Sequence, residues 1–219
     1  MKSPPKFVFS RRPPDLPSEL PAATGATALF ETPDISIAEQ RLDGIRMEGR
    51  AAGSLRVDSC VLERVSLANS HFGSILLKDV RLVACDLANL ATRGLILVRV
   101  EFVNCRMTGL RGGEADCQDL LISEGDQRYC QFRFSQFRSA EFDSCDLEEA
   151  DFHGTNLSGS VFRKCNLRNA EMSRAKLMNA DLRGSQVEGL QLNAEDIRGA
   201  VVDAAQAMVL ALLLGIRIE

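Results

Sequence analysis

An apolar side chain recurs at every fifth position of this chain, from residue 37 to residue 202. Of these 34 positions, only Thr92, Gly112 and Gln127 are not apolar. Because 45% of all residues are apolar, chance alone would place roughly 15 apolar residues in such a series. Any fold proposed for this chain therefore has to accommodate a period of five.

Neither regular secondary structure accommodates this period by itself. On an α-helix, steps of five residues would spread the apolar series around every face. On a straight strand, an odd period would point alternate large side chains outward. A chain that turns a corner after every five residues keeps the whole series inside, and we expect such a coil here.

The positions around the large apolar residue support this interpretation. Two residues before it, small side chains predominate from residue 115 onward, as at Ala140, Cys145 and Ala150. Two residues after it, Gly or Asn is frequent, and both tolerate the positive φ of a tight turn. These corner residues are Gly44, Gly49, Asn69, Asn89, Gly94, Asn104, Gly109, Gly154, Gly159, Asn169, Asn179, Gly184, Gly189 and Gly199.

The local pattern Ala-(Asp/Asn)-Leu-x-x, as in Ala-Asp-Phe-His-Gly at 150–154, resembles the consensus of the pentapeptide-repeat family. The resemblance implies an all-β fold, a right-handed quadrilateral β-helix with one repeat per face and 20 residues per coil. With a strand spacing of about 4.8 Å, the repeats would form about eight and a half coils and a rod roughly 40 Å long.

The sequence divides into three parts. All seven prolines fall before residue 34, so residues 1–34 are expected to form an extended N-terminal arm. The arm either covers the first coil through Phe7, Phe9 or Phe30 or is a disordered tail. Residues 35–202 form the β-helix, and residues 203–219 form a C-terminal helix and tail.

The C-terminal segment resembles the short helix with a Leu-Gly-Ile ending that closes the rod in this family. Asp203 is a suitable N-cap and Gly215 a suitable helix stop. The helix is more apolar than a lid requires. Its excess either forms a homodimer contact or packs on the last coil, and the residues concerned are Met208, Leu210, Leu212, Leu213 and Leu214.

The cysteines and histidines do not predict a metal or redox site. Six of the seven cysteines occupy the small inward position and Cys117 the large one, where cysteine acts as a small hydrophobic residue. No Cys-x-x-Cys occurs, and His71 and His153 lie at outward positions far apart in the sequence. We also find no nucleophile or phosphate-loop motif, so no cofactor, metal or enzymatic activity is expected.

The segment from Thr108 to Arg133 interrupts the repeat. Gly112 replaces a large core residue, although Leu110 could compensate in volume, and Gly125 with Gln127 predicts a bulged or distorted face. Five acidic residues lie here, and two aromatic residues occupy nearby corners, where they are either exposed for contact or locally buried. This candidate partner surface consists of Glu114, Asp116, Asp119, Glu124, Asp126, Tyr129 and Phe134.

Charge is unevenly distributed between the two halves. Residues 1–110 carry 14 Lys/Arg and 12 Asp/Glu, a net of +2, and residues 111–219 carry 12 and 18, a net of −6. The overall net charge of −4 argues against direct nucleic-acid binding. A second candidate patch is apolar, and its outward residues are Leu76, Val83, Ile96, Val98 and Val103.

Some members of the family mimic DNA in width and charge, bind DNA gyrase or topoisomerase IV, and protect against quinolones or other topoisomerase poisons. The resemblance therefore implies a non-enzymatic antibiotic-resistance function with a protein partner, and the apolar excess of the C-terminal helix favours a homodimer. The alternative is a protein-interaction scaffold without gyrase activity. No secretory signal and no transmembrane stretch are evident, which predicts a cytoplasmic protein.

Overall fold

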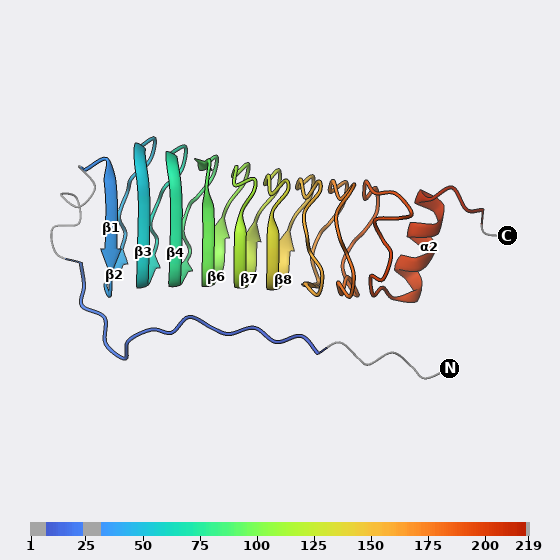
Figure 1. Cartoon of the computed structure of the whole chain (residues 1–219), viewed down its shortest axis with the longest axis horizontal. Helices are drawn as coiled ribbons and strands as arrows, with labels where there is room; N and C mark the ends of the chain where they lie inside the picture. Colours follow the sequence, from blue (N-terminus) through green and yellow to red (C-terminus); the bar gives the residue numbers. More distant parts are fainter. Residues whose placement is uncertain (1–7, 24–31, 218–219) are drawn as a thin grey trace.

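The computed structural model describes residues 8–23 and 32–217. In this part the chain forms a rod of stacked parallel strands with one short helix at its C-terminal end (Figure 1). The strands form one sheet in the order β1-β3-β4-β6-β7-β8-β9, with β2 and β5 paired to β3 and β4. Their bounds are β1 Asp34–Ala38, β2 Arg41–Asp43, β3 Ala51–Glu63, β4 His71–Val83, β5 Ala91–Thr92, β6 Leu95–Arg106, β7 Asp116–Asp126, β8 Gln136–Asp146 and β9 Val161–Arg163.

Successive coils are offset by 20 residues. Leu55 pairs with Ile75, and Ile75 pairs in turn with Leu95. Single bridges extend the same offset as far as Asp181 with Val201, where the longer strands have ended but the coil continues. The predicted all-β solenoid with 20 residues per coil is therefore confirmed, and a corner every five residues gives each coil four sides.

The corners have positive φ, as the glycines and asparagines predict. Asn69 and Asn89 have φ of 58° and 55°. Tyr129 and Phe134 have φ of 60° and 57°, although this region is unfavourable for residues with a bulky side chain. The contacts between coils impose this conformation, because the amides of Tyr129 and Phe134 donate to carbonyl oxygens of the next coil at 3.2 and 2.9 Å.

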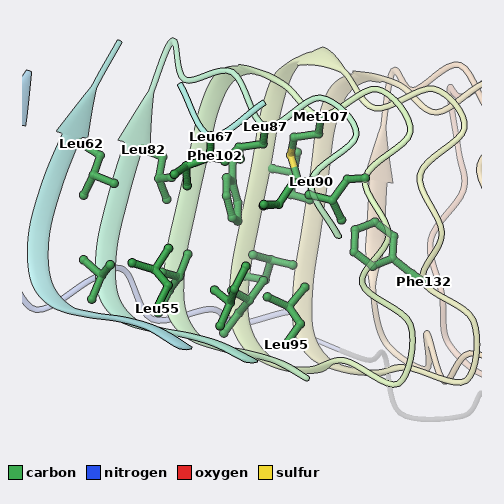
Figure 2. A pocket seen from close by; sticks show the side chains of 17 residues that line it. Leu55, Leu62, Leu67, Leu82, Leu87, Leu90, Leu95, Phe102, Met107 and Phe132 are labelled. Atoms are coloured by element: carbon green, nitrogen blue, oxygen red, sulfur yellow. The ribbon is translucent and has the colours of Figure 1, made fainter. Parts of the chain in front are cut away.

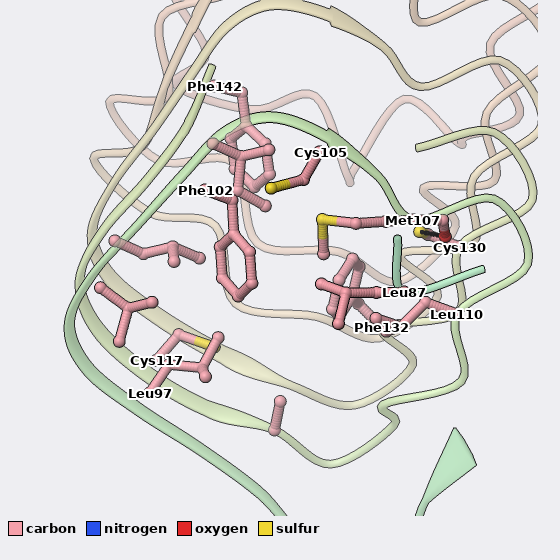
Figure 3. Packing of buried hydrophobic residues seen from close by; sticks show 14 of the residues in the cluster. Leu87, Leu97, Phe102, Cys105, Met107, Leu110, Cys117, Cys130, Phe132 and Phe142 are labelled. Atoms are coloured by element: carbon pink, nitrogen blue, oxygen red, sulfur yellow. Dashed lines mark hydrogen bonds between the residues drawn. The ribbon is translucent and has the colours of Figure 1, made fainter. Parts of the chain in front are cut away.

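The apolar series lines the inside of the rod. Phe142 and Phe162, one coil apart, stack with ring centroids 4.6 Å apart and an interplanar angle of 2°. Cysteines fill smaller positions between the large side chains, as Cys105 and Cys130 do in Figure 3, whereas Cys117 occupies a position of the large series. The core is thus continuous from coil to coil.

The first half of the rod is packed with leucine and contains a cavity of about 30 Å³ (Figure 2). Apolar side chains such as Leu62, Leu82 and Phe102 line it. A cavity of this size and character stays dry, because a water molecule would find no hydrogen-bond partner there. We therefore regard it as a packing gap between leucines.

The irregular coil keeps its register. The expected compensation by Leu110 is shared with Leu95. A β-carbon on Gly112 would lie 2.7 Å from Leu95 Cδ2 and 3.3 Å from Leu110 Cδ2, so both side chains reach into the space that Gly112 leaves open. Gly125 pairs with both Cys105 and Cys145 in the regular offset, so the predicted bulge is absent. The distortion is confined to the φ of Gly125, which is 131°.

Helix α2, Ala204–Leu213, closes the C-terminal end. Asp203 caps it in a reciprocal capping box with Gln206. The Gln206 side-chain amide donates to the carbonyl oxygens of Leu182 and Ser185 at 2.6 and 2.7 Å, so it satisfies acceptors of the last regular coil that no further strand would reach. Within residues 8–23 and 32–217, no helix is long and apolar enough to cross a bilayer.

The described part of the arm, residues 8–23, lies along the outside of the rod. Its later residues are at the first coils, and its N-terminal residues point toward the C-terminal end of the rod (Figure 1). At one end the backbone of Pro21 and Ala23 bonds to that of Arg41 at 2.9 Å. At the other end, Arg12 contacts Asp119. Phe9 is half-buried, whereas Phe7 and Phe30, the other two aromatic residues considered for covering the first coil, lie outside the described residues.

Candidate interaction surface

The predicted partner surface does not form one continuous patch. Glu114, Asp119, Glu124, Tyr129 and Phe134 occupy successive corners, each with a positive φ between 51° and 60°. Since four corners complete a coil, these residues point to all four sides of the rod. Residues that are close in the sequence do not share one surface here, because five residues along the chain correspond to a quarter turn around the rod.

Three of the five predicted acidic residues are paired with arginine. Asp126 accepts from Arg128 at 2.7 Å, and Asp116 is bonded to Arg138. Asp119 is buried beneath the arm, where its Oδ1 accepts from the amide of Arg12 at 3.1 Å. In the described part of the chain, only Glu114 and Glu124 of this group are exposed without an ion pair.

Hydrogen bonds from the Arg128 side chain lower the pKa of Asp126 to about 2, against the opposing effect of partial burial. The backbone amide of Arg128 also donates to this carboxylate, at 3.1 Å. Asp126 is therefore a firmly ionised carboxylate. Its charge is largely balanced by the arginine beside it.

The two aromatic residues at the corners are half exposed. Tyr129 is 48% exposed and Phe134 is 52% exposed, so the irregular coil does not bury them. The Phe134 ring packs edge-to-face against His153, with centroids 5.3 Å apart, and lies over Gly154 of the next coil. The adjacent corners of Tyr129 and Phe134 flank one side of the rod, where they are available for contact.

Arginines neutralise much of the acidic second half. Six outward arginines between residues 128 and 183 each form an ion pair, mostly with a carboxylate on a neighbouring coil. Surface pairs of this kind contribute little to stability, but they cancel charge locally. The pairs are Arg128–Asp126, Arg133–Asp151, Arg138–Asp116, Arg163–Glu141, Arg168–Glu188 and Arg183–Asp181.

One side of the rod nevertheless gathers carboxylates. Asp126 pairs in register with Asp146, and Arg128 bridges them, with its Nε 3.5 Å from Asp146 Oδ2. The corners that bound this side add four carboxylates that have no ion pair in the described residues. We call this surface the acidic side, and it consists of Glu124, Asp126, Asp143, Asp146, Glu148 and Glu149.

The apolar outward residues of the first half occupy separate sides. Leu76 pairs with Ile96 and Val83 with Val103, so the predicted stacking within each pair is confirmed. The two pairs do not meet, because the corner that contains Val98 and the following side lie between them. Ile96 is the most exposed of these residues, at 46%.

The residues predicted for a dimer contact fall into two groups. Leu210 is only 5% exposed and packs on the last coil, so it is not available to a second chain. Met208, Leu212 and Leu213 are 54%, 60% and 42% exposed. Leu214 is half-buried at the end of the helix.

The seven cysteines are buried and unpaired. Burial raises the pKa of the Cys117 and Cys130 thiols, which keeps them protonated. The Cys130 thiol donates to the carbonyl oxygen of Met107 at 3.0 Å. No group of three or more His, Cys, Asp or Glu side chains in the described ranges is arranged to hold a metal ion.

The repeats match a known family. Residues 128–154 and 145–184 match the model for pentapeptide repeats, with eight copies. Residues 128–184 therefore carry pentapeptide repeats. No curated protein matches it in a sequence search.

Solved structures of pentapeptide-repeat proteins are similar to this chain at low sequence identity. QnrB1, a plasmid-mediated fluoroquinolone resistance protein in trypsin-treated form, is 20% identical, with 84% of this chain and 100% of that chain covered and a TM-score of 0.38. HetL, from the cyanobacterium Nostoc sp. strain PCC 7120, is involved in heterocyst differentiation regulation. It is 17% identical, with 80% and 91% covered and a TM-score of 0.41.

Sequence reasoning missed the acidic side of this repeat-containing chain, although the signal was present. Residues 20 apart are neighbours in the rod, so Asp126 lies beside Asp146 and the corner of Glu124 beside that of Asp143. A search at this offset would have found the group. A search within one stretch of sequence instead finds residues that are distributed around the four sides of one coil.

Proposed function

We propose that this protein is a non-enzymatic binding protein whose acidic side enters the basic DNA-binding groove of a type II topoisomerase such as DNA gyrase, and so protects the enzyme against poisons. The concentration of carboxylates on one side of the rod supports the proposal. Their side chains project from the strands and corners of stacked coils, so a basic groove would meet an ordered array of negative charge. Glu124, Asp143, Glu148 and Glu149 carry the charge that arginine does not neutralise.

A supercoiling assay with purified DNA gyrase tests this proposal. We expect micromolar protein to inhibit supercoiling, or to restore it in the presence of a quinolone. Neutralising the free carboxylates of the acidic side should reduce either effect at least 10-fold, because the electrostatic attraction is lost. The neutralised variant carries Glu124→Gln, Asp143→Asn, Glu148→Gln and Glu149→Gln.

A control variant with the same net charge separates a specific surface from a general charge effect. It neutralises four exposed carboxylates elsewhere on the rod and should keep full activity. Equal loss in both variants would contradict recognition through the acidic side, and no effect of the native protein on gyrase would contradict the proposed target. The control substitutions are Glu39→Gln, Glu48→Gln, Glu114→Gln and Glu195→Gln.

The alternative function is a scaffold for a different protein partner. The half-exposed Tyr129 and Phe134 favour it, because aromatic side chains at an interface often dominate binding energy. A scaffold of this kind would have no effect in the gyrase assay. Its binding would instead be weakened by Tyr129→Ser and Phe134→Ser, as measured on a partner captured by the native protein and purified.

We also propose that α2 joins two copies of the chain. Met208, Leu212 and Leu213 expose large apolar surfaces beyond what closure of the rod uses. We expect the mass measured by light scattering to be that of a dimer, and Leu212→Lys with Met208→Lys to shift it to that of a monomer. Val201→Lys, at another exposed apolar residue outside the helix, should leave the dimer intact, and a monomeric native protein would contradict the proposal.

A further inference from the structure

The arm rests on three carboxylates that lie on successive coils of the rod. Asp79 belongs to β4, Glu101 to β6 and Asp119 to β7. Their side chains are only 4%, 13% and 6% exposed, which is low for carboxylates on the outside of a solenoid. We call Asp79, Glu101 and Asp119 the arm seat.

Two of these carboxylates accept hydrogen bonds from the backbone of the arm. The amide of Arg12 donates to Asp119 Oδ1 at 3.1 Å, and the amide of Asp15 donates to Asp79 Oδ1 at 2.9 Å. Any residue except proline supplies such an amide. The third carboxylate recognises charge, because Glu101 accepts from the Arg11 guanidinium at 2.9 Å.

The spacing of the two backbone bonds matches an extended, proline-rich chain. Arg12 and Asp15 are three residues apart, which spans about 9 Å in a polyproline conformation. Asp119 and Asp79 are two coils apart, which spans about 10 Å at the usual strand spacing. The prolines at 13, 14 and 17 favour this extended form, so the arm presents an amide to every second coil.

The seat is rigid, whereas the arm is held by few contacts. Burial opposes ionisation of Asp79, but the hydrogen bonds from Arg99 and from the amide of Asp15 outweigh it, and the pKa of Asp79 is lowered. Arg99, at the same corner of the next coil, holds that carboxylate in place, with Nε 2.5 Å from Oδ1. On the arm, by contrast, the Arg12 side chain is 70% exposed.

Asp119 retains capacity for a better ligand than the arm. Its Oδ2 is buried without a hydrogen-bond partner among the described residues, although Arg12 Nε lies 3.4 Å away. A buried carboxylate oxygen without a donor is costly. A chain that placed a donor at this atom would therefore bind more tightly than the arm does.

We propose that the arm seat is a docking site for an extended, proline-rich basic segment of a partner protein, and that residues 8–23 occupy it as a displaceable internal ligand. A partner segment fits if it carries arginine at its N-terminal side and free amides three residues apart. The internal arm competes with it at the millimolar effective concentration typical of a short tether. Partner binding then requires the arm to leave the seat.

Fluorescence anisotropy with a labelled synthetic peptide of residues 8–20 tests the proposal. The protein is the full-length chain in which residues 9–20 are replaced by Gly and Ser in equal number, so the rod and the tether length are unchanged. We expect this chain to bind the peptide saturably and at least 10-fold more tightly than the native chain, whose own arm competes. Absence of saturable binding, or equal binding to both chains, would overturn the proposal.

Peptide variants identify the contact. Asp15→Pro removes the amide while keeping the chain extended, and it should weaken binding at least 10-fold. Asp15→Asn keeps the amide, and Ser18→Pro changes an amide that makes no hydrogen bond to the described residues, so both should bind like the native peptide. Loss of binding with Asp15→Asn, or unchanged binding with Asp15→Pro, would show that the arm seat does not recognise the backbone amide of residue 15.

Discussion

Gln127 is the residue at which the core departs most from its own pattern. It lies fully buried in a column that is otherwise apolar, between Met107 and Leu147, which are one coil away on either side. Its Nε2 donates to the carbonyl oxygen of Cys105 at 3.2 Å, but its Oε1 has no hydrogen-bond partner in the described part of the chain. Glycine at 125 makes room for this side chain, since a β-carbon there would lie 2.9 Å from Gln127 Nε2.

We expect Gln127→Leu to stabilise the protein by about 1 kcal/mol, because it removes an unpaired buried oxygen and restores the apolar column. The free energy of unfolding in urea measures this effect. Gly125→Ala should destabilise the protein, since the new β-carbon would collide with the carbonyl oxygen of Cys105. A loss of stability in Gln127→Leu would mean that the bond to Cys105 outweighs the unpaired oxygen.

At the scale of elements, α2 acts as the end plate of the solenoid. Leu210 covers the apolar interior, and Gln206 covers the carbonyl oxygens of Leu182 and Ser185. A solenoid is stabilised by contacts between neighbouring coils, so damage at one end is expected to remain local. The helix therefore stabilises the last coils more than the rest of the rod.

We expect Gln206→Leu to destabilise the last coils by about 2 kcal/mol, because the carbonyl oxygen of Ser185 loses its donor and that of Leu182 keeps only the bond from the Ser185 amide. Hydrogen exchange should accelerate in residues 181–201 and remain unchanged in β4 and β6. Ala207→Gln, at an exposed position of the same helix outside the proposed dimer contact, is the control and should leave exchange unaltered. Faster exchange along the entire rod would contradict local closure by α2.

At the scale of the whole molecule, the interior is sealed along its length. The cysteines are spread along the rod from Cys60 to Cys165, and all are buried. Their reactivity requires both exposure and deprotonation, and burial opposes each. They therefore report on opening of the solenoid.

We expect none of the seven thiols to react with an aromatic disulfide reagent in the native protein over minutes at pH 8, and all seven to react after unfolding in urea. The raised pKa of Cys117 and Cys130 supports this expectation for the middle of the rod. The rate of thiol modification as urea is added measures it. Fast reaction of any native thiol would reveal a coil that opens independently.

The sequence by itself determined which side chains lie inside. A period of five with small residues two positions earlier leaves one arrangement in which the whole series is buried, and Leu147, Phe152 and Leu157 are indeed fully buried. It also determined the C-terminal cap, because Asp203 and Gly215 carry local signals that need no distant partner. These features depend on neighbours along the chain, and the sequence displays those neighbours directly.

Only the tertiary structure decided which outward residues act together. Asp126 meets Asp146 across a coil, and the amide of Arg12 meets Asp119 across 107 positions of sequence. The physical reason is that burial constrains every inward position, whereas outward positions tolerate many residues, so only the 20-residue offset between stacked coils tells which of them are neighbours. The acidic side and the arm seat therefore follow from the stacking of coils and from the path of the arm.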